Sequence, residues 1–245
     1  MLIILRKIIF MLVLGIIAIA PVIALSSSEK QIAVNTHNQY RSQLAKGQVL
    51  NRGAELLPSG SNIYKLSYSD TLEQAAQAWA DNCEFKHSED QLAQTGQGQN
   101  LYEIDTQQDT SSALTSAADM WWNEVVEVGI NSDLIIRSSM FGDENNQIGH
   151  FTAMAWGDTT QIGCGVSYCA SQGFTLLVCN YYKSGNVIGR PIYESGSQCQ
   201  SASDVRLIPD LIVICQWVYA LHLMETQLLN LVITRTVPDR EITID

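Results

Sequence analysis

The chain has 245 residues, of which 25 are acidic and 14 are basic, so its formal net charge is −11 at pH 7. Binding to nucleic acid or to an anionic membrane surface requires clustered lysines and arginines, and the sequence contains no such cluster. The composition therefore argues against both classes of partner. The length is enough for one domain with a sizeable core, and no internal repeat indicates more than one.

Residues 1–24 have the organisation of a secretory signal peptide. Arg6 and Lys7 form a charged amino-terminal region, an apolar run from Ile8 to Ala20 follows, and small residues up to Ala24 offer a cleavage site. The alternative is a membrane anchor, which needs about 20 consecutive apolar residues. This run is shorter and is followed by a proline and serines, so we expect a secreted, extracellular protein.

Two helices are predicted in the first half of the chain. Ile32 to Lys46 carries apolar residues at helical spacing and is followed by a glycine. A second helix is predicted to start at Asp70, which forms a capping box with Glu73, and to continue to Cys83. This helix delivers Cys83 and, just past its end, His87.

The segment Gln91 to Gln99 is rich in glutamine and glycine, which predicts a loop. A third helix follows it, capped by Thr110 or Ser112, with a wide apolar face that ends near Glu124.

Three apolar runs after the third helix predict strands. They are Phe151 to Trp156, Ile162 to Tyr168 and Phe174 to Tyr181. Helices first and a clustered antiparallel sheet afterwards predict a layered α+β domain.

The cysteines indicate a disulfide frame. All six follow the predicted signal peptide, and an even number in an exported chain is more often bridged than free. Spacing alone cannot choose among the 15 pairings that six cysteines allow.

Several short motifs occur in an order and spacing that resemble one family. They are Cys83-Glu84-Phe85-Lys86-His87-Ser88, Gly98-Gln99-Asn100-Leu101, Trp121-Trp122-Asn123-Glu124, Gly149-His150-Phe151-Thr152-Ala153-Met154-Ala155-Trp156 and Cys179-Asn180-Tyr181. This set resembles the CAP superfamily of secreted cysteine-rich proteins, which includes insect venom antigens and plant pathogenesis-related class 1 proteins. The sequences of these motifs are most similar to those of nematode SCP-like or venom-allergen-like proteins.

The resemblance implies a domain plan and a fold. A signal peptide at 1–24 precedes a CAP domain at 25–199, and residues 200–245 form a divergent extension. The CAP domain is expected to be a three-layer α/β/α sandwich with a central antiparallel sheet, stabilised by disulfides. By resemblance, the implied disulfide pairs are Cys83–Cys169 and Cys164–Cys179. Cys199 and Cys215 are then left for each other, as a pair that the resemblance itself does not imply.

In the family, two histidines and two acidic residues line one cleft, and the resemblance places His87, Gln99, Glu124 and His150 there. Gln99 stands where the family has a glutamate, so one carboxylate is missing. Two neutral imidazoles can bind Zn²⁺ or a similar divalent ion, and Glu124 could either ligate it directly or orient a histidine. With an uncharged Gln99, the expected metal site on His87, His150 and Glu124 is weak.

The other histidines are not expected to be ligands. His37 is predicted on the polar side of the first helix, and His222 lies outside the resemblance. Leu211 to Ile233 is long enough to span a bilayer, but the polar and charged residues within it make that costly, so no stable membrane span is expected.

The favoured function is that of an extracellular binding or effector protein, immunomodulatory or related to defence, whose partner is an unidentified extracellular protein or lipid. One alternative is a metal-dependent hydrolase that uses the same cleft with Glu124 as the base. Hydroxyl nucleophiles exist only as sequence neighbours, Ser88 beside His87 and Thr152 near His150, and no Gly-x-Ser-x-Gly or His-Glu-x-x-His motif is present. Another alternative is a protein that binds sterols or fatty acids.

Overall fold

The computed structural model describes residues 24–142, 147–197, 207–208 and 211–212. Nearly all of the predicted signal peptide, the Cys199–Cys215 pair, His222 and most of the extension at 200–245 lie outside the described residues. Among the residues described, no helix is long and apolar enough to cross a membrane.

The central sheet has the strand order β1-β3-β4-β2. Strands β2, β3 and β4 pair antiparallel, whereas the two-residue β1 runs parallel to β3. Their bounds are β1 Ser67–Tyr68, β2 Gly98–Ile104, β3 Gln161–Cys169 and β4 Phe174–Tyr182. A short pair, β5 Leu207–Ile208 and β6 Leu211–Ile212, is antiparallel.

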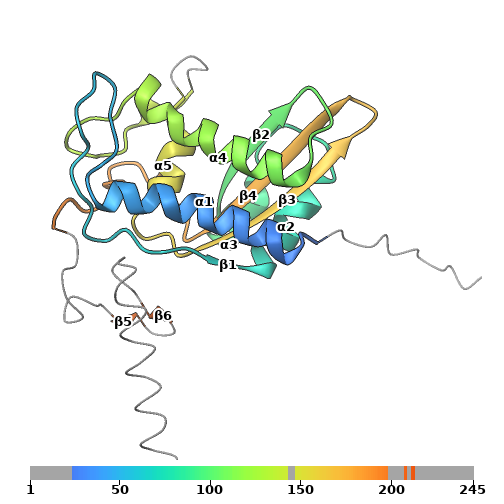
Figure 1. Ribbon diagram of the computed structural model, residues 1–245, viewed down its shortest axis with the longest axis horizontal. Helices are drawn as coiled ribbons and strands as arrows, with labels where there is room; N and C mark the ends of the chain where they lie inside the picture. The colour runs from blue at the N-terminus through green and yellow to red at the C-terminus, as the bar shows by residue number, and fades with distance from the viewer. Residues whose placement is uncertain (1–23, 143–146, 198–206, 209–210, 213–245) are drawn as a thin grey trace, which may run out of the picture.

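Helices cover both faces of this sheet (Figure 1). Helix α2 packs on β3 and β4, while α1 and α5 pack against α4 on the other side. The helices are α1 Ser27–Ala45, α2 Asp70–Ala80, α3 Glu89–Thr95, α4 Thr110–Glu127 and α5 Gly149–Ala155, with a 3-10 turn η1 at Ser138–Met140. The predicted α/β/α sandwich is therefore confirmed.

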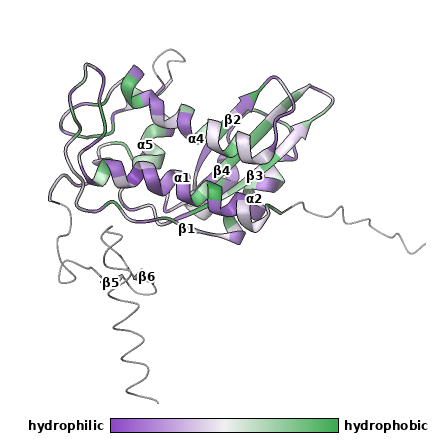
Figure 2. Ribbon diagram, viewed as in Figure 1, coloured by the Kyte–Doolittle hydropathy of each residue, from purple (hydrophilic) through white to green (hydrophobic). Residues whose placement is uncertain are grey.

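Each face of the sheet has its own core. Successive residues of a strand point to opposite faces, and β4 follows this rule. Leu176 and Val178 pack with Ala76 and Ala80 of α2, whereas Tyr181 belongs to the larger core under α1, α4 and α5. Figure 2 shows the apolar colouring concentrated along β3 and β4 between the helical layers.

Helix α1 begins earlier than predicted, and helix α2 begins at Asp70, as predicted, but has a different cap. Helix α1 starts five residues before Ile32, because Ser26 and Glu29 form a capping box at its amino-terminal end. Helix α2 is capped by Ser69, whose hydroxyl accepts from the Leu72 N–H, so the predicted Asp70–Glu73 capping box is wrong. The Glu73 carboxylate instead accepts a hydrogen bond from the Leu25 N–H.

Two other predictions of secondary structure are wrong. The run Phe151 to Trp156 forms helix α5 and not a strand, and every residue from Phe151 to Ala155 is buried. The predicted loop at Gln91 to Gln99 contains most of α3 and the start of β2. Helix α3 has acidic residues in its first turn and ends at Gly96, which adopts φ 64°, a left-handed conformation that glycine tolerates.

The described part of the chain contains two disulfides, and both fasten the sheet. Cys83, in the turn after α2, is bonded to Cys169 at the end of β3. Cys164 and Cys179 are opposite residues of β3 and β4 and are bonded to each other.

A buried arginine joins α1 to α5. The Arg41 guanidinium donates to the carbonyl oxygens of Met154 and Trp156 at 2.7 and 2.8 Å, and its Nε donates to the Tyr64 carbonyl at 2.8 Å. Burial lowers the pKa of Arg41 to about 9, so the group keeps its charge at neutral pH. These bonds satisfy carbonyls at the carboxyl end of α5 and fix that helix against α1.

Candidate functional site

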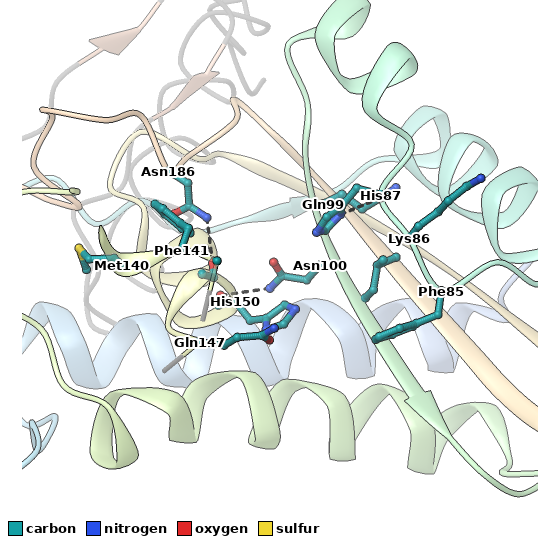
Figure 3. A pocket seen from close by; sticks show the side chains of 13 residues that line it. Phe85, Lys86, His87, Gln99, Asn100, Met140, Phe141, Gln147, His150 and Asn186 are labelled. Atoms are coloured by element: carbon teal, nitrogen blue, oxygen red, sulfur yellow. Dashed lines mark hydrogen bonds between the residues drawn. The ribbon is translucent and has the colours of Figure 1, made fainter. Parts of the chain in front are cut away.

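A cavity of about 290 Å³ lies where β2, the start of α5 and the segment after α2 meet. Both histidines predicted as ligands and Gln99 line it, whereas Glu124 does not. The lining residues are Phe85, Lys86, His87, Gln99, Asn100, Leu101, Met140, Phe141, Gly142, Gln147, Gly149, His150 and Asn186. Figure 3 shows His87 and Gln99 on one side of the cavity and His150 on the other, with Asn100 between them.

Strand β2 brings the two sides together. Successive side chains of a strand point to opposite faces, so Gln99 and Asn100 reach different neighbours. Gln99 contacts the segment that follows α2, and Asn100 contacts the first turn of α5. The strand thereby links the surroundings of His87 to those of His150.

His150 is oriented by Glu124. Its Nδ1 lies 2.5 Å from Glu124 Oε1, and Glu124 Oε2 accepts from the Phe151 N–H at 2.8 Å. The ring also stacks on Trp121, with centroids 5.9 Å apart and an angle of 18° between the planes. Because a carboxylate only accepts, Nδ1 carries a proton, and Nε2 of the neutral ring is left as an acceptor. Glu124 therefore positions His150 from behind.

His87 is oriented in the same way by a neutral amide. Gln99 Oε1 lies 3.1 Å from both His87 Nδ1 and the Ser88 N–H. Gln99 Nε2 donates to Ser88 Oγ and to Asn180 Oδ1, at 3.0 Å each. These partners fix which end of the amide is oxygen, so His87 Nδ1 is the donor and its Nε2 is left as an acceptor.

Asn100 connects the cavity to a buried chain of hydrogen bonds. Its Nδ2 donates to the His150 carbonyl at 3.1 Å and to the Tyr181 hydroxyl at 3.3 Å. The Tyr181 hydroxyl lies 2.9 Å from His37 Nε2, and His37 Nδ1 lies 2.8 Å from the Ala33 carbonyl. The chain runs from the cavity wall to α1.

The prediction that His37 lies on the polar side of the first helix is wrong, because its side chain is buried in this network. Burial lowers its pKa to about 4 and also raises the pKa of Tyr181. Sequence reasoning missed this role, although His37 and Arg41 are spaced i, i+4 and therefore share one helix face. Both of their side chains lie on the side of α1 that packs on the core.

The hydroxyls named as nucleophile candidates are engaged elsewhere. Ser88 Oγ accepts from Gln99 Nε2, and Thr152 Oγ1 lies 2.7 Å from Asn186 Oδ1. Over the described ranges, no hydrogen bond joins either hydroxyl to a histidine. The arrangement does not show the nucleophile and base pair that covalent hydrolysis requires.

The cavity can offer a metal two imidazole nitrogens. Among the residues that the structure describes, no group of three His, Cys, Asp or Glu side chains could hold one ion. His87 and His150 each keep Nε2 free of protein partners in this part of the chain, and neutral imidazole is a common ligand for zinc. The donor set therefore fits a divalent ion whose remaining ligands come from water or a bound molecule.

Known proteins resemble this chain over most of its described length. The model of the cysteine-rich secretory protein family, CAP, matches residues 34–181. The chain is 36% identical over 173 residues to venom allergen 5.02 of Dolichovespula maculata, which covers 69% of this chain and 78% of that protein. It is 30% identical over 180 residues to Ancylostoma secreted protein of Ancylostoma caninum, which covers 73% of this chain and 42% of that protein.

Solved structures show the same likeness. The crystal structure of Na-ASP-1 has a TM-score of 0.69 at 30% identity and covers 76% of this chain and 46% of its own. A crystal structure of NaASP2 with Zn²⁺ has a TM-score of 0.66 at 31% identity and covers 72% of this chain and 90% of its own. The match thus spans less than half of Na-ASP-1 and of Ancylostoma secreted protein.

Proposed function

This chain belongs to the CAP family of cysteine-rich secretory proteins, and from that membership we propose that it is a secreted, extracellular binding or effector protein. Its binding site is the cavity between His87 and His150, where a divalent cation is held weakly. The relatives named for venom and for secretion support the extracellular setting. The partner is an extracellular protein or lipid.

One observation carries the proposal: in both cavity histidines, Nδ1 is hydrogen-bonded to a fixed acceptor, and Nε2 is available to bind a ligand. Such fixed tautomers favour metal ligation, because the second nitrogen needs no rearrangement to bind. The net charge of −11 adds a general attraction for cations. A bound Zn²⁺ would supply a positive centre for an oxygen or nitrogen atom of the ligand.

The weakness of the site follows from its charges. Glu124 places a negative charge behind His150, but Gln99 supplies no charge beside His87. Among the residues that the structure describes, none that lines the cavity is acidic. A cation held by two neutral imidazoles therefore has less compensating charge than one with a second carboxylate near it.

Calorimetric titration with Zn²⁺ tests this proposal. The wild-type protein is expected to bind one ion, and His87→Ala and His150→Ala should each lower the affinity at least tenfold, because each removes one of two protein ligands. Tyr168→Ala, at an exposed position outside the cavity lining, is the control. Unchanged affinity in both histidine variants would refute the cation site.

A metal-dependent hydrolase is the second candidate, and the Glu124–His150 pair favours it, since a carboxylate and an imidazole in contact resemble a general base with its orienting group. Generic peptide and ester substrates should be tested with and without chelator. Turnover that chelator abolishes and that disappears in His150→Ala would establish hydrolysis. The sterol or fatty-acid alternative stays a prediction.

A further inference from the structure

Asn100 presents to the cavity a buried acceptor that has no partner among the described residues. The residue is 1% exposed, and its Nδ2 donates to the His150 carbonyl, which fixes the other end of the amide as oxygen. Over the part of the chain described, no group donates a hydrogen bond to Asn100 Oδ1, and the residue lies between the two histidines (Figure 3). A buried acceptor of this kind is costly to leave unpaired, so it points to a ligand that donates.

Both imidazoles also present acceptors to the cavity. His87 Nε2 and His150 Nε2 are left as lone pairs because both Nδ1 atoms are committed. The donors of two lining amides are occupied: Gln99 Nε2 by Ser88 and Asn180, and Asn186 Nδ2 by the Gly149 carbonyl at 2.9 Å. A further lining amide, that of the exposed Gln147, offers both a donor and an acceptor. Three acceptors therefore face one cavity.

The only ammonium among the lining residues is turned elsewhere. Lys86 Nζ pairs with Glu84 and extends away from the histidines (Figure 3). The rim is apolar, with Phe85 at 55% exposure and Leu101, Met140 and Phe141 beside the cavity. A ligand that fits both parts has several N–H donors at one end and an apolar body at the other.

We propose that this cavity binds a primary ammonium group carried on an aromatic or apolar body. A protonated primary amine has three N–H donors, which matches the acceptors Asn100 Oδ1, His87 Nε2 and His150 Nε2. The body of the ligand packs on Phe85, on one side of the cavity (Figure 3). The inference rests on the proposed function in that it uses the same cavity and the same histidines.

Calorimetry at pH 8 with chelator present tests the ligand class, because an alkylammonium keeps its charge there. The probes are phenethylamine, its N,N,N-trimethyl analogue and 2-phenylethanol. Phenethylamine is expected to bind at least tenfold more tightly than either of the others, since the first analogue has the charge without N–H donors and the second has no charge. Equal binding of the trimethyl analogue, or no binding of phenethylamine, would overturn the proposal.

A further comparison of two probes distinguishes a free amine from a lysine side chain of a partner protein as the source of the ammonium group. Nα-acetyl-lysine methylamide represents a lysine of a partner protein, and phenethylamine represents a free amine. Tighter binding of phenethylamine supports a free aromatic amine. Tighter binding of the lysine compound contradicts the aromatic body, and it assigns the cavity to a protein side chain.

Two variants assign the atoms. Asn100→Ala should lower phenethylamine affinity at least tenfold, and circular dichroism checks its fold because the amide also holds the His150 carbonyl. Phe85→Ala changes an exposed side chain, so it should fold normally and still bind more weakly. Affinity equal to that of the Tyr168→Ala control in both variants would refute the assignment.

Competition between Zn²⁺ and phenethylamine distinguishes a failure of this inference from a failure of the proposed function. If both cations use the same imidazoles, adding Zn²⁺ should displace phenethylamine. Amine binding without zinc binding would refute only the metal site, whereas zinc binding without amine binding would refute only the ammonium site.

A second inference rests on Glu73 and is independent of the cavity. Glu73 is 3% exposed, its Oε2 lies 2.7 Å from Lys30 Nζ, and its Oε1 accepts from the Leu25 N–H at 2.6 Å. Leu25 is the residue that directly follows the predicted signal peptide, and its side chain is part of the core. With cleavage after Ala24, as predicted, the first nitrogen of the mature chain would lie against a buried carboxylate.

We infer that removal of residues 1–24 creates an α-ammonium on Leu25 that Glu73 binds. Hydrolysis of the Ala24–Leu25 peptide bond consumes one water, and the proton that the new carboxylic acid of Ala24 releases passes to the Leu25 amine, so the products are a carboxylate and an ammonium. An ammonium forms a stronger hydrogen bond to a carboxylate than the amide it replaces. Processing thus adds a charge partner for Glu73 beside Lys30.

Mass spectrometry of the secreted protein should find Leu25 as the first residue, and a different terminus would refute the inference. The chain beginning at Leu25 should then melt about 4 °C higher than the same chain extended by Gly-Ser, in which the Leu25 nitrogen is an ordinary amide. In Glu73→Gln this difference should shrink. An equal difference in Glu73→Gln, or none in the wild type, would contradict the pairing.

Discussion

Gln99 determines the charge beside His87, because its Oε1 accepts from the ring where a carboxylate would add a negative charge. Replacement by glutamate keeps that acceptor. The second carboxylate oxygen would meet Asn180 Oδ1, so Asn180 must turn its amide and give up its hydrogen bond to Gln97. The structure therefore accommodates glutamate after an amide flip.

Gln99→Glu should raise the affinity for Zn²⁺ about tenfold, since an added charge near the cation is worth on the order of 1.4 kcal/mol in a partly buried site. Calorimetric titration measures the change. Gln97→Glu adds the same charge outside the cavity lining and serves as control. If both variants gain equally, the effect comes from net charge and not from the position of Gln99.

His37 makes the fold sensitive to acid. Burial lowers its pKa from 6.5 to about 4. Between these pH values His37 therefore binds a proton in the unfolded chain but not in the folded protein. Stability should therefore fall by about 3 kcal/mol as the pH drops from 6.5 to 4. Urea unfolding measures this, and His37→Gln should show a smaller loss over the same range. An identical loss in the variant would mean that other groups cause it.

At the scale of elements, α2 lies directly on the backbone of β3. A Cβ added at Gly165 would lie 2.3 Å from Gln77 Cα, and one at Gly163 would lie 2.3 Å from the Glu73 nitrogen. Neither helix backbone atom can move without shifting α2. The glycines thus set the distance between the helix and the sheet.

Gly165→Ala should destabilise the protein by about 2–3 kcal/mol, because overpacking forces the backbone to shift. Gly98→Ala is a matched control, since its nearest atom would be 3.5 Å away in ordinary contact. Chemical denaturation of both variants gives the comparison. Similar stability of the two would contradict the close approach of α2 to β3.

The elements differ in how well their sequences identify them. Helices α1, α2 and α4 carry one apolar face, so the periodicity locates them within a few residues. Helix α5 is buried on all sides, so its short apolar run has no polar face and fits a strand equally well. The α3 segment has no buried residue, and its helix depends on its ends rather than on an apolar face.

The residues of the site, too, could be predicted from the sequence only in part. The motifs located His87, Gln99 and His150, all of which line the cavity. They could not show that Glu124 lies behind His150 or that Asn100 has an acceptor without a partner among the described residues, because both depend on how α5 meets β2. Residue spacing along the chain contains no information on such contacts between distant segments.

For the whole molecule, the disulfides should matter more than the metal. Cys83–Cys169 closes a loop with a sequence separation of 86 and Cys164–Cys179 one of 15, which the chain-entropy model values at about 4–5 and 3 kcal/mol. A weak ligand at 100 times its Kd adds only about 2.7 kcal/mol. Thermal unfolding with reductant should therefore show a larger loss of Tm than unfolding with chelator. A loss with chelator as large as that with reductant would reverse this ranking.

The central claim is that His87 and His150 offer their Nε2 atoms to one ion in one cavity. NMR of the imidazole nitrogens during a Zn²⁺ titration tests it most directly. The Nε2 signals of both residues should shift with the same saturation curve while both Nδ1 protons remain and the buried His37 is unchanged. A shift of only one of the two, or separate saturation curves, would contradict the shared site.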